Sequence, residues 1–445
     1  MLPLTNMTSN SEDEYFADGM TEELISTLSQ MRALKVISRT SIMRFKKTDK
    51  STTMIGSELN AGTVLEGSVR KSGTRLRITV QLIDVQSDVH LWSENYDREL
   101  KDVFEVQSDV AKSIANALKV HLLEEDKERI DEKKTDSIEA YTLYLKGRRY
   151  LNQRMPKSID KAIEYFELAI ESDHNYARAY AGLADCYLVK YIHGGTKQDL
   201  EKCKEFAIKA VELDEKIAEA HAALGQAFHI SNDKANAEKE LKLAIELNPN
   251  LVDARLAYGG FFSDHGDYLD MFEQALKAME LDPLSPRANT FLGNAYYCQK
   301  QWDKALRQLK RGIELDPQMT YPYLRLALVY SKIGMFSEAI SAAEKSVDDS
   351  VFRPILAYVL AKAGRKNEAQ SILEEIRSSE KPTRDEDLPA AYLALGMKEE
   401  TYACLERAYQ LERLTVGDLL RPELEEIAKE ERFQKLIEKV RIRMR

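Results

Sequence analysis

The sequence predicts an α+β protein in which a small mixed α/β domain precedes an all-α array of antiparallel helix pairs. Two observations support this prediction. Leu-Asp-Pro or Leu-Asn-Pro returns every 34 residues, beginning at Leu247, Leu281 and Leu315. Apolar and polar residues alternate strictly from Arg75 to Leu82, which is the period of a half-buried strand. Because the two periods occupy different parts of the chain, we expect two domains.

Other positions share the 34-residue period. Gly225, Gly259 and Gly293 keep the spacing, and each is followed three residues later by an aromatic residue. Small residues let two helices approach closely, and a proline after the second helix ends it. The period and the pattern resemble those of tetratricopeptide repeats, which stack into a superhelical solenoid. We expect about eight units over residues 137–415 and a capping helix over 416–445.

The first 123 residues are expected to form the α/β domain, joined to the array by a charged helical linker over 124–136. The strand alternation continues on both sides of a hairpin turn at Lys71–Thr74. The expected strands are 34–38, 63–70, 76–82 and 89–96. The expected helices are 21–31, 54–59 and a longer one that follows Asp102 as far as Leu118.

Several ordered motifs of this domain are similar to the TolB amino-terminal-like (FlgO-like) domain. They are Leu2-Pro3, Glu14–Leu24, Val36–Ser41, Val64–Arg70, Leu76–Asp84 and Leu91–Arg98. The resemblance implies a tetratricopeptide array behind the domain, as in the carboxyl-terminal regions of cyclase-, kinase- or winged-helix-linked regulators. No such effector precedes Met1 in this sequence, where relatives carry a longer apolar strand before Leu-Pro. We therefore expect either a stand-alone form or the carboxyl-terminal part of a longer protein.

Composition and charge narrow the classes of function. The net charge of -10 is spread along the chain, which favours solubility and disfavours binding to duplex nucleic acid. No apolar run approaches the roughly 20 residues of a membrane span, so a cytoplasmic protein is expected. The four cysteines have no paired spacing and the seven histidines no metal-ligand spacing. We expect no cofactor, no metal and no enzymatic activity.

Three local features allow a second interpretation. The basic hairpin Val69–Arg77 suits phosphate contacts, but a charged edge that discourages aggregation is favoured. Gly194–Lys197 vaguely resembles a phosphate-binding loop, yet a connection between two helices is favoured because no strand precedes it. His221 and His229 share a helix but are too far apart in sequence for one metal ion, so ordinary histidines on a helix face are expected.

The predicted function is a scaffold or regulatory adaptor that binds a partner peptide or protein in the concave groove of the array. In tetratricopeptide proteins the first helix of each unit lines this groove. By that resemblance the groove residues are Tyr144, Arg148, Asp185, Gln226, Asn294, Tyr297, Leu324 and Tyr358. The alternative is the sensory half of a signalling protein whose effector lies outside this chain. The sequence leaves the oligomeric state open.

Overall fold

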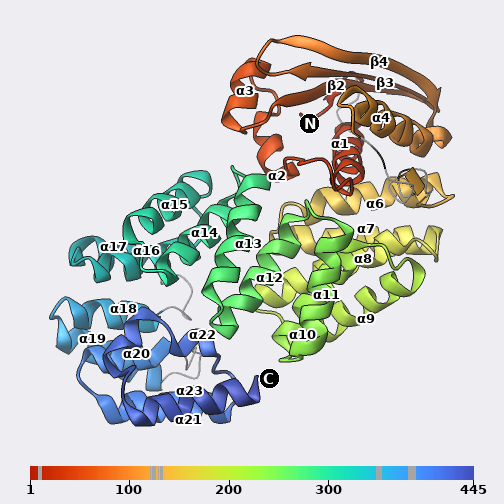
Figure 1. The fold of residues 1–445 in the computed structure, drawn as a ribbon. Helices are drawn as coiled ribbons and strands as arrows, with labels where there is room; N and C mark the ends of the chain where they lie inside the picture. The colour runs from red at the N-terminus through yellow and green to blue at the C-terminus, as the bar shows by residue number, and fades with distance from the viewer. Residues whose placement is uncertain are drawn as a thin grey trace. The chain divides into compact units, whose positions relative to one another are not determined.

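The computed structural model describes residues 1–8, 13–120, 122, 127–128, 130, 134–346, 353–378 and 387–444. The chain divides into two compact units (Figure 1). The first unit contains Met1–Ala257 and Glu280–Asp282, and the second contains Tyr258–Met279 and Pro283–Arg445. The α/β domain lies in the first unit, and we call it the front module, residues 1–117.

The front module has a four-stranded sheet with the order β1-β2-β3-β4. The strands are β1 (Thr5–Asn6), β2 (Thr63–Ser72), β3 (Arg75–Asp84) and β4 (Val89–Glu99). β1 runs parallel to β2, and the other two pairs are antiparallel. The tight turn between β2 and β3 is made by Gly73, whose φ of 59° suits a residue without a side chain.

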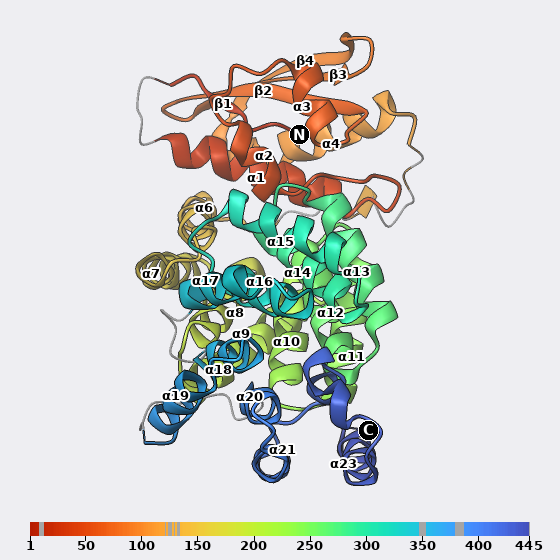
Figure 2. The same cartoon turned by 90° about the vertical axis from the view of Figure 1, so that its left-hand side faces the viewer.

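One face of this sheet is covered by helices. Along β3 the residues Leu76, Ile78, Val80 and Leu82 are buried, whereas Arg77 is exposed. In Figure 1 and Figure 2, α1 (Glu14–Ser29) and α4 (Val103–Ala117) lie on the same side of the sheet. The predicted period-two pattern therefore builds the core between the sheet and these helices. Two short helices, α2 (Arg39–Ile42) and α3 (Thr52–Glu58), precede β2.

Two predictions for the front module are wrong. The predicted strand 34–38 is extended but pairs with no strand, because its Val36 and Ser38 N–H groups donate to the array instead. The first helix begins seven residues before Thr21, at Glu14. Most of the predicted linker 124–136 lies outside the described residues.

In the part of the chain that the structure describes, the array has eight antiparallel helix pairs, from α6 to α21. In the first unit the helices are α6 (Ile138–Leu151), α7 (Pro156–Ser172), α8 (Ala177–Ile192), α9 (Lys197–Leu213), α10 (Ala218–Ile230) and α11 (Lys234–Leu247). Both units include residues of α12 (Val252–His265) and α13 (Tyr268–Leu281).

The remaining helices belong to the second unit. They are α14 (Pro286–Cys298), α15 (Trp302–Leu315), α16 (Tyr321–Lys332), α17 (Phe336–Ser346), α18 (Arg353–Lys362), α19 (Lys366–Ser378), α20 (Leu388–Ala394), α21 (Lys398–Gln410), α22 (Val416–Leu419), the 3-10 helix η6 (Pro422–Ile427) and α23 (Glu431–Arg443). The last helix buries Phe433, Leu436, Ile437 and Val440.

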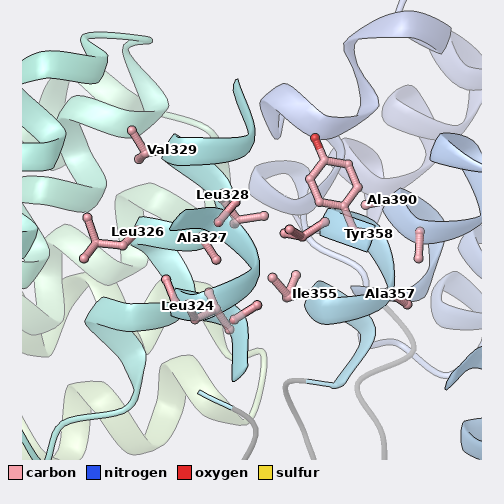
Figure 3. Packing of buried hydrophobic residues seen from close by; sticks show 14 of the residues in the cluster. Leu324, Leu326, Ala327, Leu328, Val329, Ile355, Ala357, Tyr358 and Ala390 are labelled. Carbon is pink, nitrogen blue, oxygen red and sulfur yellow. The ribbon is translucent and has the colours of Figure 1, made fainter. Parts of the chain in front are cut away.

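Glycine positions explain why the repeat keeps its period. A Cβ at Gly293 would lie 2.7 Å from Leu309 of the paired helix, and one at Gly225 would lie 2.7 Å from Leu241. Both contacts are shorter than atomic radii allow, so a larger residue would separate the helices. Gly334, in the turn between α16 and α17, has a φ of 79°. Figure 3 shows the resulting core in the second unit, where Leu324, Ile355 and Tyr358 are buried.

Candidate functional site

The first unit contains a charged contact between the front module and the array. Glu22, in the middle of α1, accepts hydrogen bonds from Arg148 Nε at 2.6 Å and Asn152 Nδ2 at 2.7 Å, both donors belonging to the end of α6. Arg39 Nε lies 3.1 Å from the same carboxylate. Two arginines and one amide therefore surround a single buried acid.

A second acid of α1 adds to this contact. Glu23 is 4% exposed and accepts a hydrogen bond from Arg178 Nη1 at 2.5 Å, at the beginning of α8. Next to the acids, Gln107 Nε2 of α4 donates to the hydroxyl of Tyr141 at 2.8 Å. Gly19 packs so closely on Leu145 that a Cβ would lie 2.8 Å from it. We call these contacts the α1 interface.

Burial and charge oppose each other in the α1 interface. Burial by itself would raise the pKa of Glu22, but the guanidinium groups of Arg148 and Arg39 outweigh it, so the pKa is lower than usual. Burial would lower the pKa of Arg148, but the carboxylate of Glu22 holds this pKa well above its ordinary value. Both groups are therefore charged at neutral pH, and each depends on the other.

The segment after α1, residues 29–38, is hydrogen-bonded to turns between helices of the array. Asn250 Nδ2 donates to the carbonyl groups of Ser29 at 2.8 Å and Leu34 at 2.9 Å, and its Oδ1 accepts from Val36 N–H at 3.1 Å. Further along, Ser38 N–H donates to the carbonyl of Leu281 at 2.7 Å. The Asn-Pro and Asp-Pro turns of the repeat therefore provide the hydrogen-bond partners that a neighbouring strand would otherwise supply to the backbone of residues 29–38.

Asp282, in one of these turns, is nearly inaccessible to solvent and accepts a hydrogen bond from Ser41 Oγ at 2.5 Å. Burial raises the pKa of Asp282 to about 6, although the hydroxyl groups of Ser41 and Ser38 partly counteract it. The Asp of the Leu-Asp-Pro motif thus holds the front module as well as ending a helix.

The predicted groove residues of the first unit have different surroundings. Tyr144 is buried against the rings of Phe166 and Tyr176, and Arg148 belongs to the α1 interface. Asp185 is half-buried, with Arg154 Nη2 at 3.8 Å from its carboxylate. Gln226 is half-buried as well, and its Nε2 donates to the carbonyl of Ala222 at 3.5 Å. Arg148 is thus occupied by the chain itself, and partner binding by these residues stays a prediction.

The predicted groove residues of the second unit are all buried. They are Asn294, Tyr297, Leu324 and Tyr358. The Oδ1 atom of Asn294 and the hydroxyl of Tyr297 are buried and have no hydrogen-bond partner among the residues that the structure describes. The guanidinium of Arg325 lies over the ring of Tyr297, 5.8 Å from its centre. This part of the array thus holds polar atoms that nothing described satisfies.

A segment near the end of the chain, residues 415–427, packs on the same unit, and we call it the covering segment. Its Gly417 carbonyl accepts a hydrogen bond from the hydroxyl of Tyr268 at 3.1 Å, and its Pro422 carbonyl accepts from Lys332 Nζ at 2.7 Å. A Cβ at Gly417 would lie 2.1 Å from the Ser263 carbonyl, so only glycine fits there. Arg421 pairs with Asp387 at the start of α20.

Glu423 of the covering segment is a buried acid without a partner among the described residues. Neither carboxylate oxygen has a hydrogen bond there, and the side chain is hardly exposed. Burial raises the pKa of Glu423 to about 7. Because the neutral acid is much easier to bury than the ion, the covering segment packs best with Glu423 protonated.

His221, predicted to lie on a helix face, is buried and joins α10 to α11. Its Nε2 lies 2.9 Å from the Glu215 carbonyl, which only accepts, so Nε2 carries a hydrogen. Its Nδ1 lies 2.5 Å from Glu240 Oε2, which requires a proton between these two atoms as well. Both ring nitrogens are therefore engaged, and His221 has a structural role.

The other ambiguous motifs also have structural contacts. In the basic hairpin, Arg77 Nη2 lies 2.6 Å from Asp97 of β4, and Lys71 lies over the ring of Phe16. Thr196 caps α9 reciprocally with Asp199, so the glycine-rich segment before it is a connection between helices. Among the described residues, no three His, Cys, Asp or Glu side chains are grouped to hold a metal ion. None of the helices formed by these residues is long and apolar enough to cross a membrane.

Sequence reasoning missed the two buried acids of the α1 interface, Glu22 and Glu23. The predicted helix 21–31 would place Glu22 and Glu23 in its first turn, whereas they lie in the middle of α1 and are buried. The pattern contained one usable signal, because an amphipathic helix rarely buries two adjacent acids without partners. Nothing in the sequence identified the partners Arg178 and Asn250, which are 155 and 221 residues away from the atoms they bind, Glu23 Oε2 and the Ser29 carbonyl.

Family models match three parts of this chain. Residues 218–251 match the tetratricopeptide repeat, and residues 293–334 match a TPR repeat model. Residues 2–115 match the second domain of HilA/YgeH-like transcriptional regulators. The tetratricopeptide prediction is confirmed, whereas the resemblance of the front module to the TolB amino-terminal domain is not.

A curated relative and several solved structures are similar to parts of the chain. "Putative adenylate cyclase 3" of Rhizobium meliloti (strain 1021) is 37% identical over 203 residues, which cover 45% of this chain and 35% of the relative. The matched region thus spans about a third of the relative's length.

Pseudomonas aeruginosa PilF is 21% identical, covering 52% of this chain and 98% of PilF, with a TM-score of 0.38. Cut9–Hcn1 is 15% identical, covering 69% of this chain and 55% of that one, with a TM-score of 0.46. YrrB, described as a TPR protein with an unusual peptide-binding site, is 24% identical with a TM-score of 0.27 and covers 39% of this chain and 88% of its own. These scores are too low to support an argument about function.

Proposed function

We propose that this chain is a non-catalytic interaction scaffold whose second unit binds an extended partner segment next to Asn294, Tyr297 and Tyr358. The observation that carries the proposal is the pair of unsatisfied polar atoms, Asn294 Oδ1 and the Tyr297 hydroxyl. A buried polar group without a hydrogen bond costs about 1–3 kcal/mol. Such groups are retained where a ligand supplies the missing partner, and tetratricopeptide repeats are interaction modules.

An extended peptide has the chemistry that these atoms lack. Its backbone N–H groups can donate to Asn294 Oδ1, and its carbonyl groups can accept from the Tyr297 hydroxyl. The neighbouring Arg325 adds a cation, since its guanidinium lies 5.1 Å from the centre of the Tyr321 ring and 5.8 Å from that of Tyr297. We therefore expect a partner segment that has an acidic residue near an apolar one.

The covering segment would compete with that partner for the same part of the second unit. Burial raises the pKa of Tyr268 above its usual range, and the charges of Arg421, Asp418 and Arg325 also act on it. The covering segment contacts this tyrosine, because the Gly417 carbonyl accepts a hydrogen bond from its hydroxyl at 3.1 Å. Binding of a partner beside Arg325 would require the covering segment to shift, which would make binding weaker than the groove alone allows.

The test is affinity capture from native lysate with two variants. Each combines an amide→Ala with a Tyr→Phe substitution, but at different positions. In the groove variant, Asn294→Ala is combined with Tyr297→Phe, which removes the two unsatisfied atoms and keeps the ring. In the control variant, Gln299→Ala is combined with Tyr296→Phe, on the same helix. We expect wild type and control to retain the same proteins and the groove variant to lose at least one. If all three retain an identical set, the groove proposal is wrong.

A second function is favoured by the relative whose name is a putative adenylate cyclase. In this alternative the chain is the regulatory half of a signalling protein, and the front module transmits a signal to an effector. The α1 interface would suit such a role, because it joins the front module to α6 and α8. The genomic frame upstream of Met1 tests the alternative: a cyclase, kinase or DNA-binding domain encoded in that frame favours it.

A further inference from the structure

The front module contains a cavity of about 520 Å³ that neither the groove nor the α1 interface uses. One wall is formed by β2 and β3, with Glu66, Ser68, Thr79 and Gln81. The opposite wall is the segment 45–52, and residues 2–6 close one side. This volume is in the range of small-molecule sites, about 300–1,000 Å³.

The charged side chains around the cavity differ in whether they have an ion-pair partner. Lys46 lies 2.7 Å from Glu14 and 2.5 Å from Asp18, and Lys50 lies 2.5 Å from Glu58. Glu66 accepts from the Gln81 amide and from Thr52 Oγ1 at 3.3 Å. Lys47 is exposed and has no ion pair with any residue that the structure describes. It is therefore the lysine at this cavity that is available for a ligand.

The backbone at Lys47 has an uncommon φ angle. Its φ is 61°, in the left-handed region that residues with side chains rarely adopt. The turn that imposes this angle lies between Phe45, which is buried, and Thr48. A left-handed lysine at the mouth of a cavity costs conformational energy, and such local strain clusters at ligand sites.

We propose that this cavity binds a small organic phosphate, with Lys47 as its main cation. Lysine and hydroxyl groups line the cavity beside the carboxylates of Glu14 and Glu66, and lysine and hydroxyl groups are common donors to phosphate oxygens. Ser68 and Thr48 have hydroxyl groups to donate. Phe45, Ile55 and Pro3 provide apolar surface for the organic part of the ligand.

This inference goes beyond the proposed function and does not depend on it. Lys46 connects the cavity to α1, because it pairs with Glu14 and Asp18, which lie about two turns and one turn before Glu22. A phosphate that attracted Lys46 would weaken these pairs at the beginning of the helix whose middle makes the α1 interface. Binding of a phosphorylated metabolite in the cavity would then change the α1 interface.

The experiment is isothermal titration of the full chain with adenosine monophosphate, glucose 6-phosphate and glycerol 3-phosphate, alongside adenosine, glucose, glycerol and inorganic phosphate. We expect at least one organic phosphate to bind tenfold more tightly than both its dephosphorylated form and inorganic phosphate. Lys47→Gln should weaken this binding at least fivefold. Ser68→Met, which fills the cavity from the sheet wall, should abolish it without lowering the melting temperature.

The matched control is Lys119→Gln, because Lys119 is also exposed and has a φ of 55° but lies outside the cavity. Affinity should be unchanged in this variant. The proposal fails if none of the three organic phosphates binds. It also fails if Lys119→Gln weakens binding as much as Lys47→Gln does, because that result would show general attraction of anions to surface lysines.

Discussion

The two units hold their accessory segments in different ways. In the first unit, buried charges join the front module to the array, and the side chains of Glu23 and Arg178 are 4% and 12% exposed. In the second unit the covering segment is held by the carbonyl hydrogen bonds of Gly417 and Pro422 and by one largely buried ion pair, Arg421 with Asp387, whose side chains are 20% and 6% exposed. Its other pair, Lys300 with Glu425, is 49% and 63% exposed. Glu423 is its buried acid, and it has no cation beside it among the described residues.

This difference indicates which of the two segments dissociates more easily from the array. A buried ion pair is costly to break because the remaining charge stays in a medium of low polarity. Exposed pairs and single carbonyl hydrogen bonds contribute little by themselves. The α1 interface joins two buried acids to three arginines, whereas the covering segment has one buried pair, Arg421 with Asp387. We therefore expect the covering segment to be displaced more easily than the front module.

The largest effect is expected for Glu22→Leu. Leucine keeps the helix but leaves the guanidinium groups of Arg148 and Arg39 buried without an acid. Removing one partner of a buried ion pair typically costs about 3–5 kcal/mol. Urea unfolding followed by circular dichroism measures the change, with Glu212→Leu, from an exposed pair, as control. Equal effects of the two substitutions would contradict the central role of the α1 interface.

A smaller loss is expected for Asn250→Ala, which removes all three hydrogen bonds that join this side chain to residues 29–36. At about 1 kcal/mol for each bond, the cost is roughly 2–3 kcal/mol. Hydrogen exchange should show faster exchange at Val36 N–H in particular. The control is Asn236→Ala, whose side chain bonds only to Asp233 on the surface. Unchanged protection at Val36 would refute the prediction.

Glu423→Gln is expected to act in the opposite direction and only at higher pH. The pKa of Glu423 is about 7 in the folded protein and about 4.5 ordinarily, so the protonated form favours folding and this stability is lost as pH rises through 7. A neutral glutamine should therefore raise the free energy of unfolding at pH 8 by roughly 1–3 kcal/mol and change it little below pH 4.5. Urea titrations at pH 4 and pH 8 measure both values. An equal effect at the two pH values would contradict the prediction.

The sequence predicts the repeated part of this molecule well, because each helix pair depends on neighbours one period away. Gly225 and Gly293 have the close contacts with the paired helix that their spacing implied. Contacts between distant segments could not be predicted in this way. Ser38 pairs with Leu281 instead of a strand, and Glu22 meets Arg148, because the fold brings these residues together and no local pattern records it.

The smallest effect is expected for Lys300→Gln. The Lys300 ammonium lies 2.7 Å from Glu425 of the covering segment, but both side chains are half exposed or more. Such pairs contribute about 0–1 kcal/mol and are screened by salt. The melting temperature should therefore change by less than the experimental error in 0.5 M salt. A large loss would mean that the covering segment depends on surface charge as the front module depends on buried charge, and the contrast between the two units would no longer hold.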